Sequence, residues 1–160
     1  MRYKRLTLAG KKGSEGQAAV EFAFVIILVF FTFVSLLELI FLMHTYSSLA
    51  DAAKEGMRYA IVHGTQNSIC SGPNITGGPC PDNPANNVKT AVTTYATASL
   101  HNVTASNVTV TYFPLTTGGV ACNDPGCMVR VTVNYQYAPL FGMGWPTVTI
   151  YAAANGVIMN

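Results

Sequence analysis

An apolar segment near the start of the chain restricts its fold more than any other feature. Residues 18–43 are interrupted by only two charged side chains, Glu21 and Glu38. As a helix rising about 1.5 Å per residue, these 26 residues would extend about 39 Å, enough to cross a hydrocarbon layer about 30 Å thick. A secretory signal peptide has a shorter apolar core, of about 7 to 15 residues, before its cleavage site. We therefore expect a membrane-spanning helix that stays attached to the rest of the chain.

The two carboxylates of this segment allow two interpretations. They lie 17 residues apart, or about 25 Å along a helix, so both can sit near opposite boundaries of the hydrocarbon layer. A carboxylate that reaches the centre of the layer costs about 2.5 to 3.5 kcal/mol. Glu21 is therefore either a boundary residue or a residue kept for a function.

Positive charge is concentrated before the apolar segment. Five of the nine Lys and Arg residues precede it: Arg2, Lys4, Arg5, Lys11 and Lys12. Basic flanks stay on the cytoplasmic side of a membrane, so the leader at residues 1–16 is expected in the cytoplasm and everything after about Met43 outside it. A basic arm that binds nucleic acid is the alternative, and the adjacent apolar helix argues against it.

The helix is expected to continue beyond the membrane. From Tyr46 onward apolar residues recur at steps of three and four, while Asp51, Glu55 and Arg58 share the other side. Gly64 can form a C-terminal cap. One helix is therefore predicted over residues 17–63, with its membrane-spanning part at about residues 18–43. The triplet ADA at residues 50–52 resembles a signal-peptidase site, but it falls inside this amphipathic pattern.

Residues 64–160 are expected to form an extracytoplasmic α+β domain. Asn83 before Pro84 is typical of a helix start, and an apolar stripe follows it, so a second helix is predicted at about residues 84–100. Three segments then carry apolar residues at every second position, at residues 108–112, 129–137 and 148–154. They predict a small antiparallel sheet of about three strands whose apolar face packs against both helices.

All four cysteines fall in the part expected outside the cytoplasm. An even number of cysteines in an oxidising compartment predicts two disulfides, for which three connectivities exist. We favour the local pairs, Cys70 with Cys80 and Cys122 with Cys127, because each pair brackets a loop rich in Gly, Pro and Asn. The second pair would close a turn predicted at Asp124-Pro125-Gly126. A zinc site is the alternative, but neither spacing matches a two-residue knuckle, and we expect no metal.

The outer domain offers little for catalysis. Its candidate groups are His63, His101, Asp82 and Asp124, and no motif links them to a nucleophile. The glycine pairs at residues 77–78 and 118–119 lack the lysine and the following helix of a phosphate loop. His101 is better explained as a residue at the end of the second helix. We expect no enzyme, no cofactor and no nucleic-acid partner.

Two stretches resemble a known family. Residues 16–22 read GQAAVEF at the head of the apolar helix, and residues 49–60 read LADAAKEGMRYA. They resemble the TadE-like family of bacterial tight-adherence pilus proteins, and the run at residues 129–140 is similar to the family's C-terminal strands. The resemblance implies a pilin-like fold and a minor pseudopilin-like, membrane-anchored component of a Tad/Flp (type IVc) pilus assembly and secretion system. Its implied partners are the bacterial inner membrane, other pilus or pseudopilin subunits and the Tad assembly platform.

Carried over residue by residue, the resemblance also implies a processing site. Gly16 would precede the bond cut by prepilin peptidase, Gln17 would become the new N-terminus, and Glu21 would be the fifth residue of the mature protein. The carboxylate could then neutralise the new ammonium group, on the same or a neighbouring subunit, where the dielectric is low. The alternative function is a signal-anchored extracytoplasmic binding or adhesion module whose leader is not processed.

Overall fold

The computed structural model describes residues 14–73, 80–82, 85–115, 119–142 and 146–159. They divide into two compact units, Met1–Leu39 and Ile40–Asn160. The first helix, α1 (Ser14–Val62), contributes residues to both units. All the other helices and strands that the structure describes belong to the second unit.

The helix α1 is continuous over 49 residues, as the apolar segment and the amphipathic pattern after it predict. It ends at Val62, one residue before the predicted end. Its last carbonyls find partners in the following loop, because the Asn67 side chain donates to Val62 O at 2.9 Å and Ser71 N donates to His63 O at 2.8 Å. These bonds replace the partners that a helix C-terminus lacks.

The predicted three-stranded antiparallel sheet is confirmed. It consists of β1 (Val108–Phe113), β2 (Met128–Tyr137) and β3 (Val148–Val157), in the spatial order β1-β2-β3. β2 pairs with β3 over its whole length, but with β1 only from Met128 to Val133. A short 3-10 helix, η1 (Ala105–Asn107), leads into β1.

The second helix, α2 (Asn86–Thr97), is shorter than predicted. The expected cap, Asn83 before Pro84, lies outside the residues that the structure describes. Asp82 supplies the described cap: its carboxylate accepts hydrogen bonds from the backbone N–H groups of Asn86 and Asn87, at 2.8 and 2.7 Å. An acidic side chain at this place also opposes the positive end of the helix dipole.

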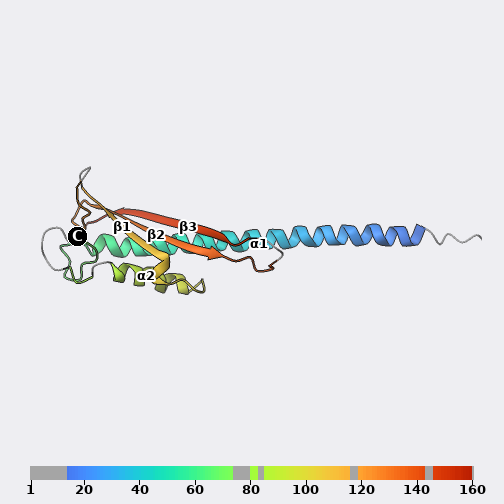
Figure 1. Ribbon diagram of the computed structural model, residues 1–160, viewed down its shortest axis with the longest axis horizontal. Coiled ribbons are helices and arrows are strands. Elements are labelled where there is room, and N and C mark those ends of the chain that lie inside the picture. Colours follow the sequence, from blue (N-terminus) through green and yellow to red (C-terminus); the bar gives the residue numbers. More distant parts are fainter. Residues whose placement is uncertain (1–13, 74–79, 83–84, 116–118, 143–145, 160) are drawn as a thin grey trace, which may run out of the picture. The chain divides into compact units, whose positions relative to one another are not determined.

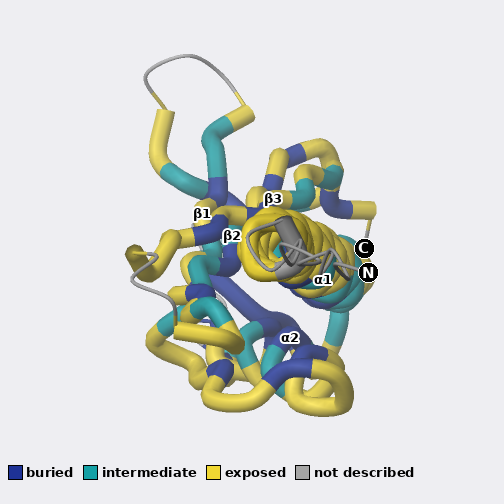
Figure 2. The backbone as a smooth tube through the Cα atoms, turned by 90° about the vertical axis from the view of Figure 1, so that its right-hand side faces the viewer, coloured by how far each residue is buried: buried dark blue, intermediate teal, exposed yellow. Residues whose placement is uncertain are grey.

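The core of the second unit lies between the C-terminal part of α1, α2 and one face of the sheet (Figures 1 and 2). Alternate residues of β2 are fully buried there, while Arg130 between them faces outward. α1 contributes mainly small buried residues, and Gly56 marks the closest approach. A Cβ atom at Gly56 would collide with the side chain of Val92 on α2 and lie 3.4 Å from Val131 on β2. The absence of a side chain therefore lets three elements meet.

The turn predicted at Asp124-Pro125-Gly126 is present. Cys127 N donates to Asp124 O at 3.0 Å, and Gly126 has a φ of +96°, which favours glycine. Phe141, beyond the end of β2, is 45% exposed, and Trp145 lies outside the described residues. The glycines at residues 77, 78 and 118 also lie outside them.

Candidate functional site

The residues implied as a processing site lie in the first turns of α1. Gln17 and Glu21 face the same side of the helix, where the Gln17 amide donates to a Glu21 carboxylate oxygen at 3.1 Å. Both side chains are exposed. A Cβ atom on Gly16 would meet nothing within 4 Å. The structure therefore brings residues 17 and 21 together, and no packing contact among the described residues requires glycine at position 16.

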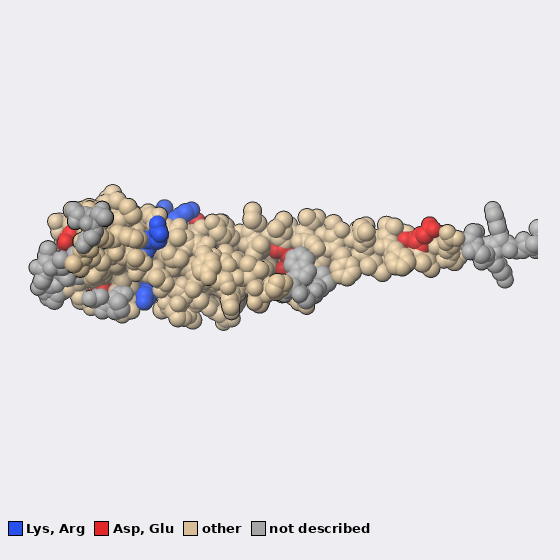
Figure 3. All heavy atoms as spheres, turned by 45° about the horizontal axis from the view of Figure 1, so that its top comes forward, with Lys and Arg blue, Asp and Glu red and all other residues tan. Residues whose placement is uncertain are grey.

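The segment after Glu21 exposes an unusual amount of apolar surface. Every residue from position 16 to position 33 is exposed, including Phe22 at 66%, Phe24 at 69% and Leu28 at 67%. Ten consecutive apolar residues, 22–31, cover all sides of a helix, because successive residues are about 100° apart. The face shown in Figure 3 has acidic side chains near the start of α1, followed by a stretch of uncharged atoms. A helix that is apolar all round needs an apolar environment.

The few polar side chains in this segment are satisfied within the helix. The hydroxyl groups of Thr32 and Ser35 donate to the carbonyls of Leu28 and Phe31, each at 2.9 Å. These bonds remove the penalty for carrying an unpaired hydroxyl into hydrocarbon. α1 is the one helix in the described part of the chain that is long and apolar enough to cross a membrane. A single N-terminal helix of this kind indicates a single-pass membrane anchor.

The cysteines lie in two pairs at disulfide distance beyond the end of α1. Cys70 and Cys80 have Cα atoms 5.3 Å apart, and those of Cys122 and Cys127 are 6.0 Å apart. These are the local pairs favoured from the loop composition, and both distances fall in the usual range for a disulfide. The candidate zinc ligands are not gathered: no group of three or more metal-binding side chains occurs among the described residues.

A buried polar cluster lies beside these pairs, and sequence reasoning missed it. Ser71 Oγ donates to the Asp82 carboxylate, and Ser71 O accepts from Tyr112 Oη at 2.8 Å and from Asn123 Nδ2 at 3.2 Å. Thr65 N in turn donates to Asn123 O at 3.1 Å. The cluster connects segments that are far apart in the sequence, and therefore no local sequence pattern predicts it. It holds the loop after α1 against β1 and the start of α2.

Burial in this region shifts the titration of two tyrosines. The pKa of Tyr112 is raised, chiefly because burial disfavours the phenolate; the hydrogen bond to Ser71 opposes this shift and the negative charge of Asp82 adds to it. The pKa of Tyr59 is also raised, by burial and then by Asp82. Both phenols therefore stay protonated through the neutral range. They serve as hydrogen-bonding and packing groups there.

The groups considered for catalysis are placed apart. His63 stacks on Tyr59, with ring centroids 3.8 Å apart, and its Nδ1 lies 2.8 Å from Tyr59 O. His101 lines a groove beside His44, which precedes His63 by 19 residues, or about 28 Å along a helix. Asp82 caps α2, and Asp124 accepts from the Thr65 hydroxyl at 2.7 Å. The two carboxylates thus have structural partners. Within the described part of the chain, neither His63 nor His101 forms a hydrogen bond to the side chain of a Ser, Thr or Cys that could act as a nucleophile.

One of three comparisons with known proteins finds a match, and it falls on α1. A family model described as TadE-like protein matches residues 16–58. This range begins at the expected processing site and includes the whole exposed apolar segment. It associates the chain with Tad pilus proteins, a structural class, as the resemblance of residues 16–22 and 49–60 implies. A search of the curated proteins finds no match, and a search of the solved structures finds none either.

Proposed function

We propose that this chain is a minor pseudopilin-like, membrane-anchored component of a Tad/Flp (type IVc) pilus assembly and secretion system. The observation that carries the proposal is the coincidence of the TadE-like match with the exposed half of α1. Within the matched range, residues 16–33 are all exposed and carry large apolar side chains on all sides of the helix. Lipid and the helices of other pilus subunits are the partners that suit such a surface.

Membrane placement follows from the charge distribution. The basic leader stays in the cytoplasm, α1 crosses the bacterial inner membrane once, and the second unit is periplasmic or extracellular. In that compartment the two cysteine pairs can oxidise, which would fasten the loops beyond the end of α1. The second unit has few charges of its own, so its contacts rely on shape and uncharged polar groups.

Processing after Gly16 would give the acidic residue its role. Prepilin peptidase would cut between Gly16 and Gln17 and leave an ammonium group at the head of an apolar helix. Glu21 lies one turn further on the same face as residue 17. Its carboxylate can pair with the ammonium group of its own or a neighbouring subunit, and the pairing would align subunits along the helix axis. A glycine that no contact requires fits a role in recognition by the peptidase.

The processing step is tested by the intact mass of the protein made with and without a prepilin peptidase. Loss of residues 1–16 only in the presence of the peptidase supports the proposal. The same mass reports the disulfides, since each bond removes two hydrogen atoms. Full-length protein in both cases would contradict processing and favour the unprocessed anchored binding module.

The role of the carboxylate is tested by Glu21→Gln, with Glu21→Asp as the matched control. The first variant keeps the shape of the side chain and removes its charge, while the second keeps the charge. Because an unpaired charge in an apolar environment costs about 3 to 5 kcal/mol, Glu21→Gln should abolish assembly of pili or reduce it severely. Glu21→Asp should retain much of it. Normal piliation by Glu21→Gln, counted by electron microscopy, would show that the helix only anchors.

A further inference from the structure

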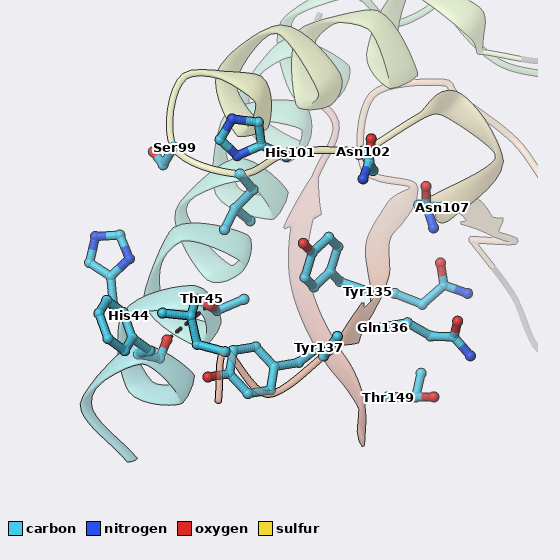
Figure 4. A pocket seen from close by; sticks show the side chains of 15 residues that line it. His44, Thr45, Ser99, His101, Asn102, Asn107, Tyr135, Gln136, Tyr137 and Thr149 are labelled. Atoms are coloured by element: carbon cyan, nitrogen blue, oxygen red, sulfur yellow. Dashed lines mark hydrogen bonds between the residues drawn. The ribbon is translucent and has the colours of Figure 1, made fainter. Parts of the chain in front are cut away.

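The second unit contains a groove of about 900 Å³ (Figure 4). α1 contributes one side, through Phe41, His44 and Thr45, and the end of β2 contributes another. The segment after α2, at residues 99–102, closes one end. This volume is within the range of clefts that bind small ligands or short segments, about 300 to 1,000 Å³.

The groove lies where the sheet is incomplete. β1 pairs with β2 only as far as Val133, whereas β2 continues beside β3 to Tyr137. In an antiparallel sheet alternate residues direct their N–H and C=O groups to each neighbouring strand. For Asn134, Tyr135 and Gln136, the structure gives no backbone partner on the β1 side among the described residues. All three line the groove. β2 therefore presents a short open edge at the bottom of a cleft.

The chain is prevented from filling this space itself. The 3-10 turn of η1 directly precedes β1 and interrupts the extended backbone there, and it is fixed by Asn107, whose Oδ1 accepts from Thr104 N and Thr104 Oγ1, each at 2.9 Å. Asn107 also lines the groove. The place of a longer β1 is thus left open by a turn with its own hydrogen bonds.

The lining of the groove combines polar side chains with apolar ones such as Phe41 and Leu100. None of the described residues that line it is Asp, Glu, Lys or Arg. The side chains of His44, His101, Asn102 and Gln136 make no hydrogen bond to another described residue. Figure 4 shows His101 and Asn102 on the side of the groove above the ring of Tyr135, with His44 on α1 beside Thr45, while the Gln136 side chain points away from that ring. The Asn134 side-chain oxygen is buried and has no donor within the described part of the chain, which is uncommon in a native protein.

We propose that this groove binds an extended, uncharged peptide segment of a partner protein as a short strand added to β2. Main-chain groups of the segment would pair with the open edge at residues 134–136, and the amide and imidazole side chains would contact its alternate side chains. A charged segment would lose hydration without meeting an opposite charge in the groove. The inference concerns the second unit alone and does not depend on processing at Gly16.

The test uses the full chain in phospholipid nanodiscs and a fluorescent hexapeptide of alternating Val and Thr, blocked at both ends. Fluorescence anisotropy should show saturable binding. Two further peptides carry N-methyl groups on the odd or on the even amides, so that each loses the donors of one edge. One of these two peptides should bind at least about tenfold more weakly than the unmodified peptide, and the other should bind with nearly the same affinity. The reason is that only one edge of an added strand faces β2.

A charge introduced into the groove locates the binding. His101→Glu should weaken binding of the neutral peptide and strengthen binding of a version in which two threonines are replaced by lysine. Thr109→Glu is the matched control, because Thr109 is exposed on β1 and does not line the groove. It should leave both affinities within about twofold of the unmodified chain.

Three results would overturn the inference. One is no binding of the neutral peptide up to about 1 mM. A second is equal affinity of both N-methylated series, which would mean that no strand is added. The third is an identical response of His101→Glu and Thr109→Glu, which would place the binding elsewhere. The N-methylated peptides need no variant, so the test remains decisive if a substitution impairs folding.

Discussion

The two halves of α1 are both rich in apolar residues, but one half exposes them and the other buries many of them. In the half that belongs to the first unit, large side chains such as Phe24 and Leu28 are exposed. In the other half the buried positions include Leu49, Ala53 and Ala60. One helix therefore carries a surface for an external environment and a surface for its own core.

The difference lies in side-chain size as well as in burial. The buried half approaches α2 and β2 closely because it presents Ala and Gly there, while bulky residues would hold the elements apart. The exposed half has no such restriction within the chain, and it carries Phe, Ile and Leu. Small residues are therefore frequent at the buried positions of α1, beside the one large fully buried residue Leu49, while large apolar residues cover its exposed half.

The largest expected effect comes from filling the closest contact. Gly56→Val should destabilise the second unit by about 3 kcal/mol, because the added side chain collides with Val92. The measurement is chemical unfolding of the purified chain in detergent, followed by near-UV circular dichroism of its tyrosines. Combining Gly56→Val with Val92→Ala should recover part of the loss.

Gly16→Ala is the matched control on the same helix. A Cβ atom at position 16 meets nothing, so the substitution should leave the unfolding of the second unit unchanged. An equal loss of stability in Gly16→Ala and Gly56→Val would contradict the division of α1 into an exposed and a packed half.

A smaller effect is expected from the buried polar cluster of the second unit, which lies beyond the end of α1. The folded chain keeps the Tyr112 phenol protonated, while the unfolded chain releases its proton near the ordinary pKa of 10.0. The free energy of unfolding should therefore be unaffected by this group below about pH 9 and should fall as the pH rises above 10. Tyr112→Phe should cost about 1 kcal/mol at neutral pH, through the lost bond to Ser71 O, and should flatten the alkaline fall.

The control for this pH dependence is Tyr151→Phe, since Tyr151 is 64% exposed. Denaturant unfolding at about pH 8 and about pH 10.5 gives the comparison. If Tyr112→Phe keeps the full alkaline fall, other groups cause it and the burial of Tyr112 has no such consequence.

The sequence predicted the elements of the fold well where a periodic pattern was local. The long helix can be recognised from the periodicity of a few turns, and β2 from the alternation of apolar residues around Val131 within a single strand. The helix start predicted at Asn83 and Pro84 lies outside the described residues, and only the folded loop shows that the Asp82 carboxylate accepts from the first backbone N–H groups of α2. Nothing local identifies Ser71 as the centre of a polar cluster, since its partners Tyr112 and Asn123 are more than forty residues away.

The candidate site divides in the same way. The spacing of Gln17 and Glu21 places them on one helix face, and the structure shows the contact. The groove could not have been predicted, because it arises from a difference in strand length. β2 extends four residues beyond its last pair with β1, and the turn held by Asn107 leaves this part of the β2 edge unpaired. Such a gap depends on register, which the alternation of apolar residues does not fix.

The smallest expected effect is a near-zero change in the unfolding free energy of the second unit. It is also the sharpest test of the difference between the two halves of α1. Phe24→Ala removes a large apolar side chain that is 69% exposed, so the unfolding free energy of the second unit should change by less than about 0.5 kcal/mol. Val92→Ala removes a smaller side chain that is fully buried and should cost about 2 kcal/mol under the same conditions. The larger deletion should be harmless because the Phe24 side chain is not part of the core. The free energy of inserting the helix into a membrane should change by only a few tenths of a kcal/mol. A destabilisation by Phe24→Ala that equals or exceeds that of Val92→Ala would show that the first half of α1 is packed within the chain, and the surface assigned to lipid and neighbouring subunits would then be occupied already.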